Sequence, residues 1–600
     1  MAQTKKGSTL EYDNVLKYVL GEFGPYQAMC FCFLALTAIP SGMIAFSVVF
    51  TLAETDSWCK VPDVHRISQQ ICSANFSEDC QGFVKNLTTP LEMSHDPCGV
   101  AWKHSQCYRY NVTADDVIHY SASSAKEEWA TKKDLIKCDQ GWEYDKSQYK
   151  LTISQQFNLV CDRYHYNALL SSISFAGSLI GSFVFGMFLD RYGRLRGLML
   201  SVVLLQAFGI TTVFSPDFTF YAAFHLLLFI AVYAVYLSGF VLATEHVGPS
   251  KRTTAGMVVA MFYSVGYMLL ALMAYNIRVW WKLQLAITIP HTIFLAYWLF
   301  IPESPRWLLS MGKVEEAEKI IRRSAKVNKV EIPSDLFEES WKPGLKDVEQ
   351  DSMTDEETKT RMLDLVKLPN MRKKTLILAF NYLANSMVYF GLSLSTSSLG
   401  GSDYLNAFIS AAVEIPGYGL PIFLMDSPRL GRRWCLFGSM ILSGCGCIAT
   451  VLVPVCGNLS WLRVTLAMIG KFGISASFGI VYVYSAELFP TPVRSFGIGI
   501  CATCSNFGAI LSPQILLLKT LWRPLPIIIF GILAIIAGIL VLPLPETRGM
   551  KLPETMAEGE RFGKKRNKNQ YPGYGEIRKI ELNDYYYYPE NGVKAPLAEF

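Results

Sequence analysis

Two charged residues interrupt long apolar stretches of this 600-residue chain. Glu414 lies within Ala-Val-Glu-Ile-Pro, and Lys471 lies within Ile-Gly-Lys-Phe-Gly. A charge inside a membrane is costly, so such a residue is a candidate for function. The carboxylate can attract the ammonium group of a small molecule, or the two residues can pair with each other across two helices. The sequence leaves both interpretations open, and a substrate cation that competes for the carboxylate would satisfy both.

Acidic and arginine residues recur at matching places in the two halves of the chain. Asp190 and Arg194 follow one apolar stretch, and Asp426 and Arg432 follow another in the second half. Such residues can form an ion-pair latch between helix ends, and a latch that exists in one conformation biases a two-state equilibrium. The predicted latch residues are Asp190, Arg191, Arg194, Glu245, Glu303, Arg306, Asp426, Arg432, Glu487, Arg494, Glu546 and Arg548.

The elements that must carry these residues are membrane helices. Hydrophobic residues make up 51% of the chain and charged residues 18%, against about 25% charged residues in a soluble domain. This composition excludes a disordered chain, and a net charge of +5 gives no reason to expect a nucleic-acid partner. A helix needs about 20 mostly apolar residues to cross a bilayer. Twelve stretches satisfy this requirement, near 25–52, 166–189, 197–214, 219–243, 253–275, 284–301, 374–396, 404–425, 434–454, 462–485, 495–518 and 523–543.

Together these stretches predict an all-α membrane protein with twelve transmembrane helices in two pseudo-symmetric six-helix halves. Lys and Arg are in excess in the short loops on one side, which places both termini in the cytosol. The expected order is a cytosolic N-terminus (1–24), the first transmembrane helix (25–52), an extracellular loop (53–165), transmembrane helices 2–6 (166–301), a cytosolic loop (302–373), transmembrane helices 7–12 (374–543) and a cytosolic tail (544–600). The cytosolic loop is expected to begin with an amphipathic helix around Ile320 and Ile321.

The predicted extracellular loop is rich in cysteine and is expected to be glycosylated. Six cysteines suggest three disulfides, and six cysteines allow 15 pairings among which sequence cannot choose. These six are Cys59, Cys72, Cys80, Cys98, Cys107 and Cys138, with Cys161 at the end of the loop outside the set. Sequons at Asn75, Asn86 and Asn111 lie in the same loop and support its extracellular placement. No Cys-x-x-Cys pair or histidine cluster indicates a structural metal.

Three motifs at the predicted cytosolic helix ends resemble the major facilitator superfamily. They are Asp-Arg-Tyr-Gly-Arg at 190–194, a second copy at 426–433 and Pro-Glu-Thr-Arg at 545–548. The second copy departs from the family pattern, because Ser427 and Pro428 separate its aspartate from its arginines. The resemblance implies two six-helix halves around a central site.

Narrower motifs resemble the organic cation, carnitine and organic anion transporter branch of that superfamily. They are the cysteine-rich loop, Pro-Glu-Ser-Pro-Arg-Trp-Leu at 302–308 and Ala-Glu-Leu-Phe-Pro-Thr at 486–491. The resemblance implies aromatic residues in the central cavity, where ring faces attract cations. The matching positions are Tyr236, Tyr382, Tyr389 and Phe478.

The resemblance also draws attention to Asn506. Cation transporters of this branch usually carry Asp at the matching position, and anion and carnitine transporters usually carry Arg. A neutral amide can hydrogen-bond an amine or a carboxylate without selecting a charge. With Glu414 and Lys471 in the same cavity, small organic cations or zwitterions become the expected substrates.

The sequence therefore predicts a plasma-membrane carrier that moves small organic cations or zwitterions by alternating access. Amines, carnitine-like compounds and β-amino-acid-like compounds fit this description. The expected partners are the substrate and the lipid bilayer, with no cofactor, and the sequence does not say whether Na⁺ or H⁺ is coupled. An organic anion exchanger, favoured by Lys471, and a non-transporting membrane receptor are the alternatives. An enzyme is not expected, because no nucleophile and base occur in a motif context and no phosphate-binding Gly-rich loop is found.

Overall fold

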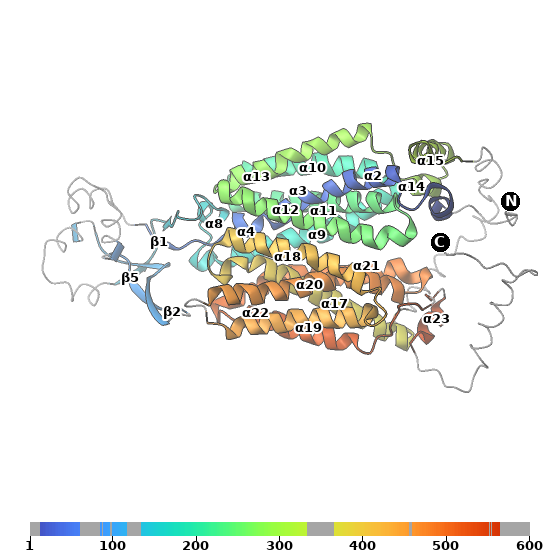
Figure 1. The fold of residues 1–600 in the computed structure, drawn as a ribbon. Helices are drawn as coiled ribbons and strands as arrows, with labels where there is room; N and C mark the ends of the chain where they lie inside the picture. Colours follow the sequence, from blue (N-terminus) through green and yellow to red (C-terminus); the bar gives the residue numbers. More distant parts are fainter. Residues whose placement is uncertain are drawn as a thin grey trace, which may run out of the picture.

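The chain forms two bundles of long helices that lie side by side, with the N-terminal half above the C-terminal half in Figure 1. The predicted sites at Asn75, Cys72, Cys80 and Cys98 lie outside the described residues. The computed structural model describes residues 12–60, 85–86, 88–96, 99–113, 115–116, 134–332, 365, 367–454, 459–550, 552–553 and 555–563.

The N-terminal half contains the first six predicted spans. Its first span is divided into three helices, and at the two junctions the hydroxyls of Thr37 and Ser47 donate to carbonyls of the preceding turn. The following four spans are single helices. The helices are α2 (Pro25–Leu36), α3 (Ala38–Phe46), α4 (Val48–Thr51), α9 (His165–Tyr192), α10 (Arg194–Val213), α11 (Phe218–Glu245) and α12 (Arg252–Asn276), with one-turn 3₁₀ helices at Cys161–Arg163 (η2) and Pro249–Lys251 (η3).

The sixth span changes its helix type part-way along. α13 (Trp280–Thr288) continues directly into a 3₁₀ helix, η4 (Ile289–Leu299). Pro290 has no N–H to donate to the preceding turn, so the α-helical ladder cannot run through this point unbroken. The Gln206 amide donates to the Thr288 carbonyl at 2.8 Å and satisfies an oxygen beside the break.

The C-terminal half contains the last six predicted spans. Ten helical segments of the described residues are long and apolar enough to cross a membrane. The shorter α22 and the α13–η4 segment bring the total to the twelve predicted spans. The helices of this half are α17 (Pro369–Leu394), α18 (Asp403–Leu424), α19 (Gly431–Leu452), α20 (Ser460–Leu488), α21 (Arg494–Leu516) and α22 (Leu525–Val541), with short 3₁₀ helices at Thr396–Leu399 (η5), Thr491–Val493 (η6) and Leu517–Thr520 (η7).

The halves are joined along two pairs of helices. α12 packs against α18, and α9 packs against α21. In the order of the spans these pairs are the fifth with the eighth and the second with the eleventh. The two-fold pseudo-symmetry that relates the halves therefore maps one helix pair onto the other, as expected for repeated halves.

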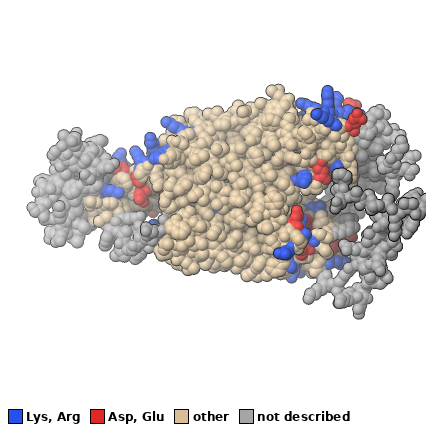
Figure 2. All heavy atoms as spheres, viewed as in Figure 1, with Lys and Arg blue, Asp and Glu red and all other residues tan. Residues whose placement is uncertain are grey.

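Charged side chains gather at the two ends of the bundle. Figure 2 shows Lys, Arg, Asp and Glu at both ends of the visible face and a broad band free of them between. Such a band matches the hydrocarbon core of a bilayer, where an exposed charge is costly. We call the end that carries the strands and cystines the disulfide end, and the opposite end, with clusters around Arg194 and Arg432, the ion-pair end.

The segment between α4 and α9 adds short β-ladders to the helical fold. In the described part of this segment, three antiparallel two-stranded sheets pair β1 with β6, β2 with β3 and β4 with β5. Disulfides join Cys59 to Cys138 and Cys107 to Cys161. Cys161 is thus bridged, which corrects the set of six that left it out. The elements are β1 (Ser57–Cys59), β2 (Leu91–Asp96), β3 (Gly99–His104), β4 (Tyr108–Tyr110), β5 (Leu135–Lys137), β6 (Trp142–Tyr144) and α8 (Ile153–Gln156).

Short helices cover each half at the ion-pair end. The predicted amphipathic helix is α15, and its buried Ile321 and Ala325 pack against Leu16 and Leu20 near the N-terminus. In the C-terminal half, the Glu560 carboxylate accepts hydrogen bonds from the backbone N–H groups of Asn370 and Met371 in the first turn of α17. These elements are α1 (Tyr12–Val15), a π-helical turn (Leu16–Leu20, η1), α14 (Pro305–Ser310), α15 (Val314–Asn328) and α23 (Met556–Arg561).

A glycine with positive φ stands directly before α10, and another is the first residue of α19. Gly193 has φ +108°, and Gly431 has φ +70°. The Glu303 carboxylate accepts the first N–H groups of α10, and Glu546 does the same for α19. A carboxylate at a helix N-terminus satisfies donors that have no partner within the helix. Glycine is needed at position 193, because a Cβ there would lie 2.5 Å from Glu303 Oε2.

We predict that Gly193→Ala lowers the stability of the folded protein by at least about 1 kcal/mol, since a positive φ is strained for alanine and its methyl displaces the capping carboxylate. Thermal unfolding of the purified protein in detergent measures this change. Gly186→Ala is the matched control, because nothing lies within 4 Å of a Cβ at this position of α9. An unchanged unfolding temperature for Gly193→Ala would contradict the role of this turn.

Candidate functional site

Glu414 is fully buried near the middle of α18, where that helix meets the N-terminal half. Its Oε2 accepts hydrogen bonds from the Ser264 hydroxyl of α12 at 2.6 Å and from the Tyr389 hydroxyl of α17 at 2.9 Å. Its Oε1 lies 2.8 Å from Lys471 Nζ. The carboxylate therefore receives two neutral donors and one cation, and one of these donors comes from the other half.

Lys471 of α20 is as buried as its partner, with 1% of its side chain exposed. Besides Glu414, its ammonium donates to the Ser393 hydroxyl at 2.5 Å and to the Tyr389 carbonyl at 3.3 Å. It also lies 3.4 Å from the centre of the Tyr389 ring, a cation–π contact. The ion pair that the sequence offered as one of two interpretations is thus present in the structure.

Burial of this ion pair costs desolvation free energy, and removal of one partner from the folded protein costs more. Desolvation of two charges can exceed their attraction, but removal of one partner leaves the other uncompensated, at a cost of about 3–5 kcal/mol. A group that replaces Lys471 on the carboxylate must therefore itself carry a positive charge.

Aromatic rings from both halves lie near the pair. Phe46 stacks on Tyr267 with ring centres 4.1 Å apart and lies 5.7 Å from Tyr263. Tyr389 packs against Phe478 at 5.4 Å. Sequence reasoning missed Phe46, Tyr263, Tyr267 and the donor Ser264. The spacing of Tyr263, Ser264 and Tyr267 within one span was a signal for them, since residues three and four apart share one helix face.

The remaining predicted cavity residues lie farther from the carboxylate. Tyr236 joins the aromatic group through Tyr263, at 5.5 Å. Tyr382 lies seven residues before Tyr389 on α17, about 10 Å away along the helix, and its hydroxyl is 2.7 Å from the Ser485 hydroxyl. Asn506 donates its amide to the Ala502 carbonyl of its own helix at 3.1 Å. The structure shows no contact of Tyr382 or Asn506 with the ion pair among the described residues.

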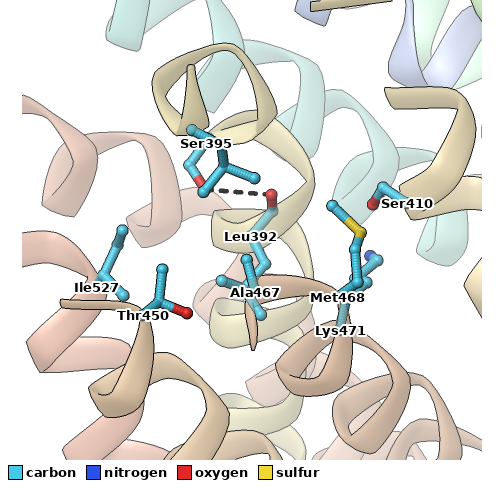
Figure 3. A pocket seen from close by; sticks show the side chains of 9 residues that line it. Leu392, Ser395, Ser410, Thr450, Ala467, Met468, Lys471 and Ile527 are labelled. Carbon is cyan, nitrogen blue, oxygen red and sulfur yellow. Dashed lines mark hydrogen bonds between the residues drawn. The ribbon is translucent and has the colours of Figure 1, made fainter. Parts of the chain in front are cut away.

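A small cavity lies beside Lys471 inside the C-terminal half, and Figure 3 shows it. Ser410 and Lys471 lie on one side of it, with Thr450 and Ile527 opposite. It has room for about one water-sized group. Lys471 of the buried ion pair therefore borders this cavity, and all the residues that line it belong to the C-terminal half.

The predicted latch residues form one cluster in each half. In the N-terminal half, Arg194 lies 3.1 Å from Asp190 and 3.2 Å from Glu245. The main-chain N–H of Arg194 donates to Glu303 at 2.9 Å. Burial raises the pKa of the Glu303 carboxyl above its ordinary value, while the amide donors favour its charged form.

The C-terminal half repeats this arrangement. Arg432 lies 3.1 Å from both Asp426 and Glu487. Its main-chain N–H donates to Glu546 at 2.8 Å. The inserted Ser427 and Pro428 do not prevent the match, because Arg432 still pairs with Asp426 across this loop.

The other predicted latch residues have different partners. Arg306 lies 3.4 Å from Asp13. Arg494 donates to the Phe489 carbonyl at 3.3 Å, and Arg191 lies over the Tyr192 ring. The main chain of Arg548 donates to Glu546. The clusters thus tie helix ends together within a half.

Comparison with known proteins places these features in a family. A family model described as "Sugar (and other) transporter" matches residues 123–558. An "Organic cation transporter protein" of Drosophila melanogaster is 38% identical over 559 residues, 92% of this chain and 95% of that protein. "Organic cation/carnitine transporter 2" of Homo sapiens is 38% identical over 552 residues, 91% and 93% of the two chains. "Solute carrier family 22 member 21" of Mus musculus is 36% identical over 576 residues, 96% and 98%.

A solved structure shows the same fold. The inward open conformation of the xylose transporter XylE from E. coli superposes with a TM-score of 0.54 at 13% identity, over 88% of this chain and 99% of that one. The matched family model, the relatives of nearly equal length and this fold agree with the two six-helix halves. The chain belongs to the sugar (and other) transporter family of the major facilitator superfamily, in the solute carrier branch of organic cation and carnitine transporters.

Proposed function

We propose that this protein transports small organic cations across the plasma membrane, with Glu414 as the residue that binds the positive group. The observation that carries the proposal is a carboxylate buried between the halves, which accepts Ser264 from one half and Tyr389 from the other. The names of the relatives, which describe organic cation and carnitine transport, support this choice of substrate.

The chemistry of binding is an exchange of cations. The ammonium group of a substrate replaces Lys471 on the carboxylate, so the negative charge stays compensated in the low-dielectric interior. The faces of nearby rings, such as Tyr263 and Tyr389, add about 0.5–2 kcal/mol each for a desolvated cation. The site binds and releases its substrate, and no covalent step is required.

Alternating access explains how a bound cation crosses. At the disulfide end, the Tyr149 hydroxyl donates to Asp403 at 3.0 Å, and Lys519 lies 2.8 Å from Glu54. Each of these contacts joins one half to the other, so this end is closed. The clusters at the ion-pair end lie within single halves, so the halves can separate there while both clusters remain intact. Opening at that end, followed by rupture of the contacts at the disulfide end, would expose Glu414 to each side in turn.

A zwitterion is a second candidate substrate. Lys471 lies 2.8 Å from Glu414, so the site contains both charges that an amino acid or a carnitine-like compound would need. Such a molecule pairs its cationic ammonium group with the Glu414 carboxylate and its own carboxylate with the Lys471 ammonium. Competition of carnitine or β-alanine against the uptake of a permanent cation distinguishes this substrate class.

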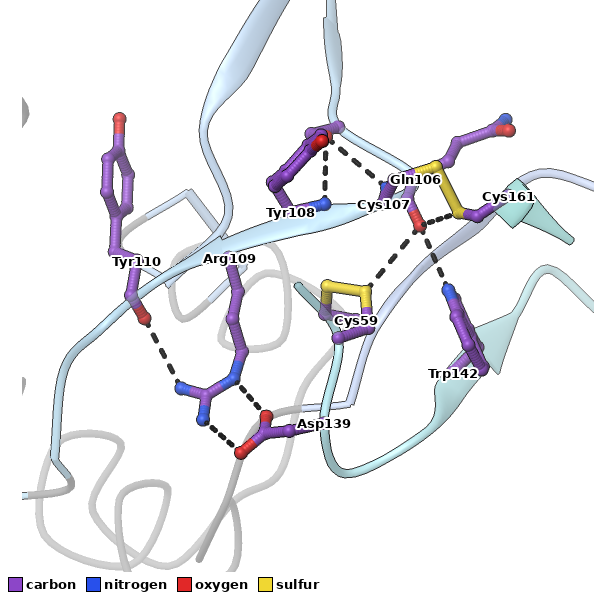
Figure 4. Close-up of a disulfide and its surroundings, with 11 residues drawn as sticks. Cys59, Gln106, Cys107, Tyr108, Arg109, Tyr110, Asp139, Trp142 and Cys161 are labelled. Atoms are coloured by element: carbon purple, nitrogen blue, oxygen red, sulfur yellow. Dashed lines mark hydrogen bonds and ion pairs between the residues drawn. A yellow bond between two sulfur atoms is a disulfide. The ribbon is translucent and has the colours of Figure 1, made fainter. Parts of the chain in front are cut away.

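The orientation follows from the chemistry of the two ends. Figure 4 shows both cystines beside the Arg109–Asp139 ion pair, which is 2.8 Å long. Disulfides persist in oxidising compartments, and arginine-rich ends face the cytosol. The disulfide end is therefore proposed to be extracellular, and the ion-pair end, with both termini, cytosolic.

We predict that Glu414→Gln reduces saturable uptake of a labelled permanent cation at least ten-fold, since a neutral amide no longer offsets the ammonium charge. Uptake in cells, normalised to the amount of protein at the surface, measures this effect. Asp217→Asn is the matched control, because the capping carboxylate of α11 is exposed and asparagine caps helices equally well. Undiminished uptake in Glu414→Gln would remove this residue from the substrate site.

We also predict that Asn86 and Asn111, both exposed at the disulfide end, carry N-linked glycans. A glycosidase should lower the apparent mass of the protein, and Asn86→Gln and Asn111→Gln should each remove part of this shift. Asn328→Gln, at the ion-pair end, should leave the glycan shift unchanged. If neither sequon substitution alters the shift, the proposed orientation loses this support.

A further inference from the structure

Two hydroxyl oxygens in the wall of the cavity beside Lys471 can accept a further hydrogen bond, those of Ser410 and Thr450. The Thr450 hydroxyl donates its proton to the Gly446 carbonyl at 2.7 Å, which leaves oxygen lone pairs for another group. Ser410 is 1% exposed, and its hydroxyl has no hydrogen-bond partner among the residues that the structure describes. Much of the remaining wall is apolar, including Leu392 and Ile527. A buried hydroxyl without a partner is costly, so the cavity favours a small group that can donate to it.

The proposed exchange of cations requires another position for the Lys471 ammonium, with acceptors for its protons. When a substrate ammonium binds Glu414, Lys471 keeps its charge but loses its carboxylate. Its other acceptors are the Ser393 hydroxyl and the Tyr389 carbonyl. An ammonium has three protons to donate and is strongly hydrated in water. If the displaced Lys471 found no third acceptor, its unpaired proton would make the binding of a substrate cation less favourable.

We propose that this cavity is the second position of the Lys471 ammonium, occupied while a substrate cation holds Glu414. The inference rests on the proposed function, because it requires a cation at that carboxylate. The ammonium is close to a water molecule in size, and the flexible four-carbon stem of lysine lets it turn away from Glu414. Ser410 and Thr450 are then positioning residues, which act on the substrate through Lys471 and do not contact it.

The acceptors also decide the protonation of the displaced lysine. Thr450 presents lone pairs to the cavity, and Ser410 can accept as well. An ammonium satisfies them, whereas a neutral amine would bring one fewer proton and a lone pair of its own. The displaced Lys471 therefore keeps its proton, and a univalent substrate crosses with one net charge.

The first experiment measures coupling between Ser410 and Lys471. Ser410→Ala should raise the KM for uptake of a permanent cation about ten-fold, since a hydrogen bond to a charged group is lost. Ser410→Thr should restore uptake, because it keeps the hydroxyl. In a Lys471→Met background, Ser410→Ala should have no further effect. Ser512→Ala is the matched control, because Ser512 is another buried serine without a hydrogen-bond partner among the described residues, on α21 away from this cavity.

Each outcome of this series has a definite meaning. An equal effect of Ser410→Ala in both backgrounds, or no effect in the wild type, would overturn the cavity proposal. If uptake still depends on Glu414 in that case, the proposed function stands. Uptake that persists in Glu414→Gln would instead overturn the proposed function.

A second experiment needs no substitution and so avoids loss of folding. Uptake of a labelled univalent permanent cation is compared with the current that it carries in voltage-clamped cells, in Na⁺-free medium. A ratio of one charge per molecule at pH 6 and at pH 8 is expected. A ratio near zero with proton movement in the opposite direction would show that Lys471 releases its proton and would overturn the proposal.

Discussion

The buried ion pair between Glu414 and Lys471 constrains the centre of this protein. Two opposite charges lie 2.8 Å apart with almost no exposure, in a region where an isolated charge is very costly. Neither can leave without a replacement of the same sign. In the proposed site this requirement selects for positive charge, because a neutral molecule that displaced the lysine would leave the carboxylate uncompensated.

The proposed site lies where the two halves meet. Both charges belong to the C-terminal half, but Ser264 of the N-terminal half donates to the same carboxylate oxygen as Tyr389. A change in how the halves meet thus alters the solvation of Glu414. The clusters around Arg194 and Arg432 each connect helix ends of one half only.

Sequence reasoning recovered most of the fold, because hydrophobic length and repeated motifs are properties of the chain itself. Apolar runs located the twelve spans, and the acid–arginine repeats located both clusters. It could not choose between the two roles of Glu414 and Lys471, which depends on whether α18 and α20 present these residues to each other. It assigned Tyr382 and Asn506 to the cavity by family position. The structure shows their hydrogen bonds to Ser485 and Ala502, and their role in the cavity stays a prediction. Cys161 was left out because pairing depends on where η2 meets β4 in space.

A structure of the full chain with a bound permanent cation tests the central claim most directly. The account predicts the cationic group within about 4 Å of the Glu414 carboxylate, with Lys471 Nζ moved beyond ion-pair distance. The ring faces of Tyr263 or Tyr389 should then contact the cation. A cation bound elsewhere, with Lys471 Nζ still 2.8 Å from Glu414 Oε1, would contradict the account.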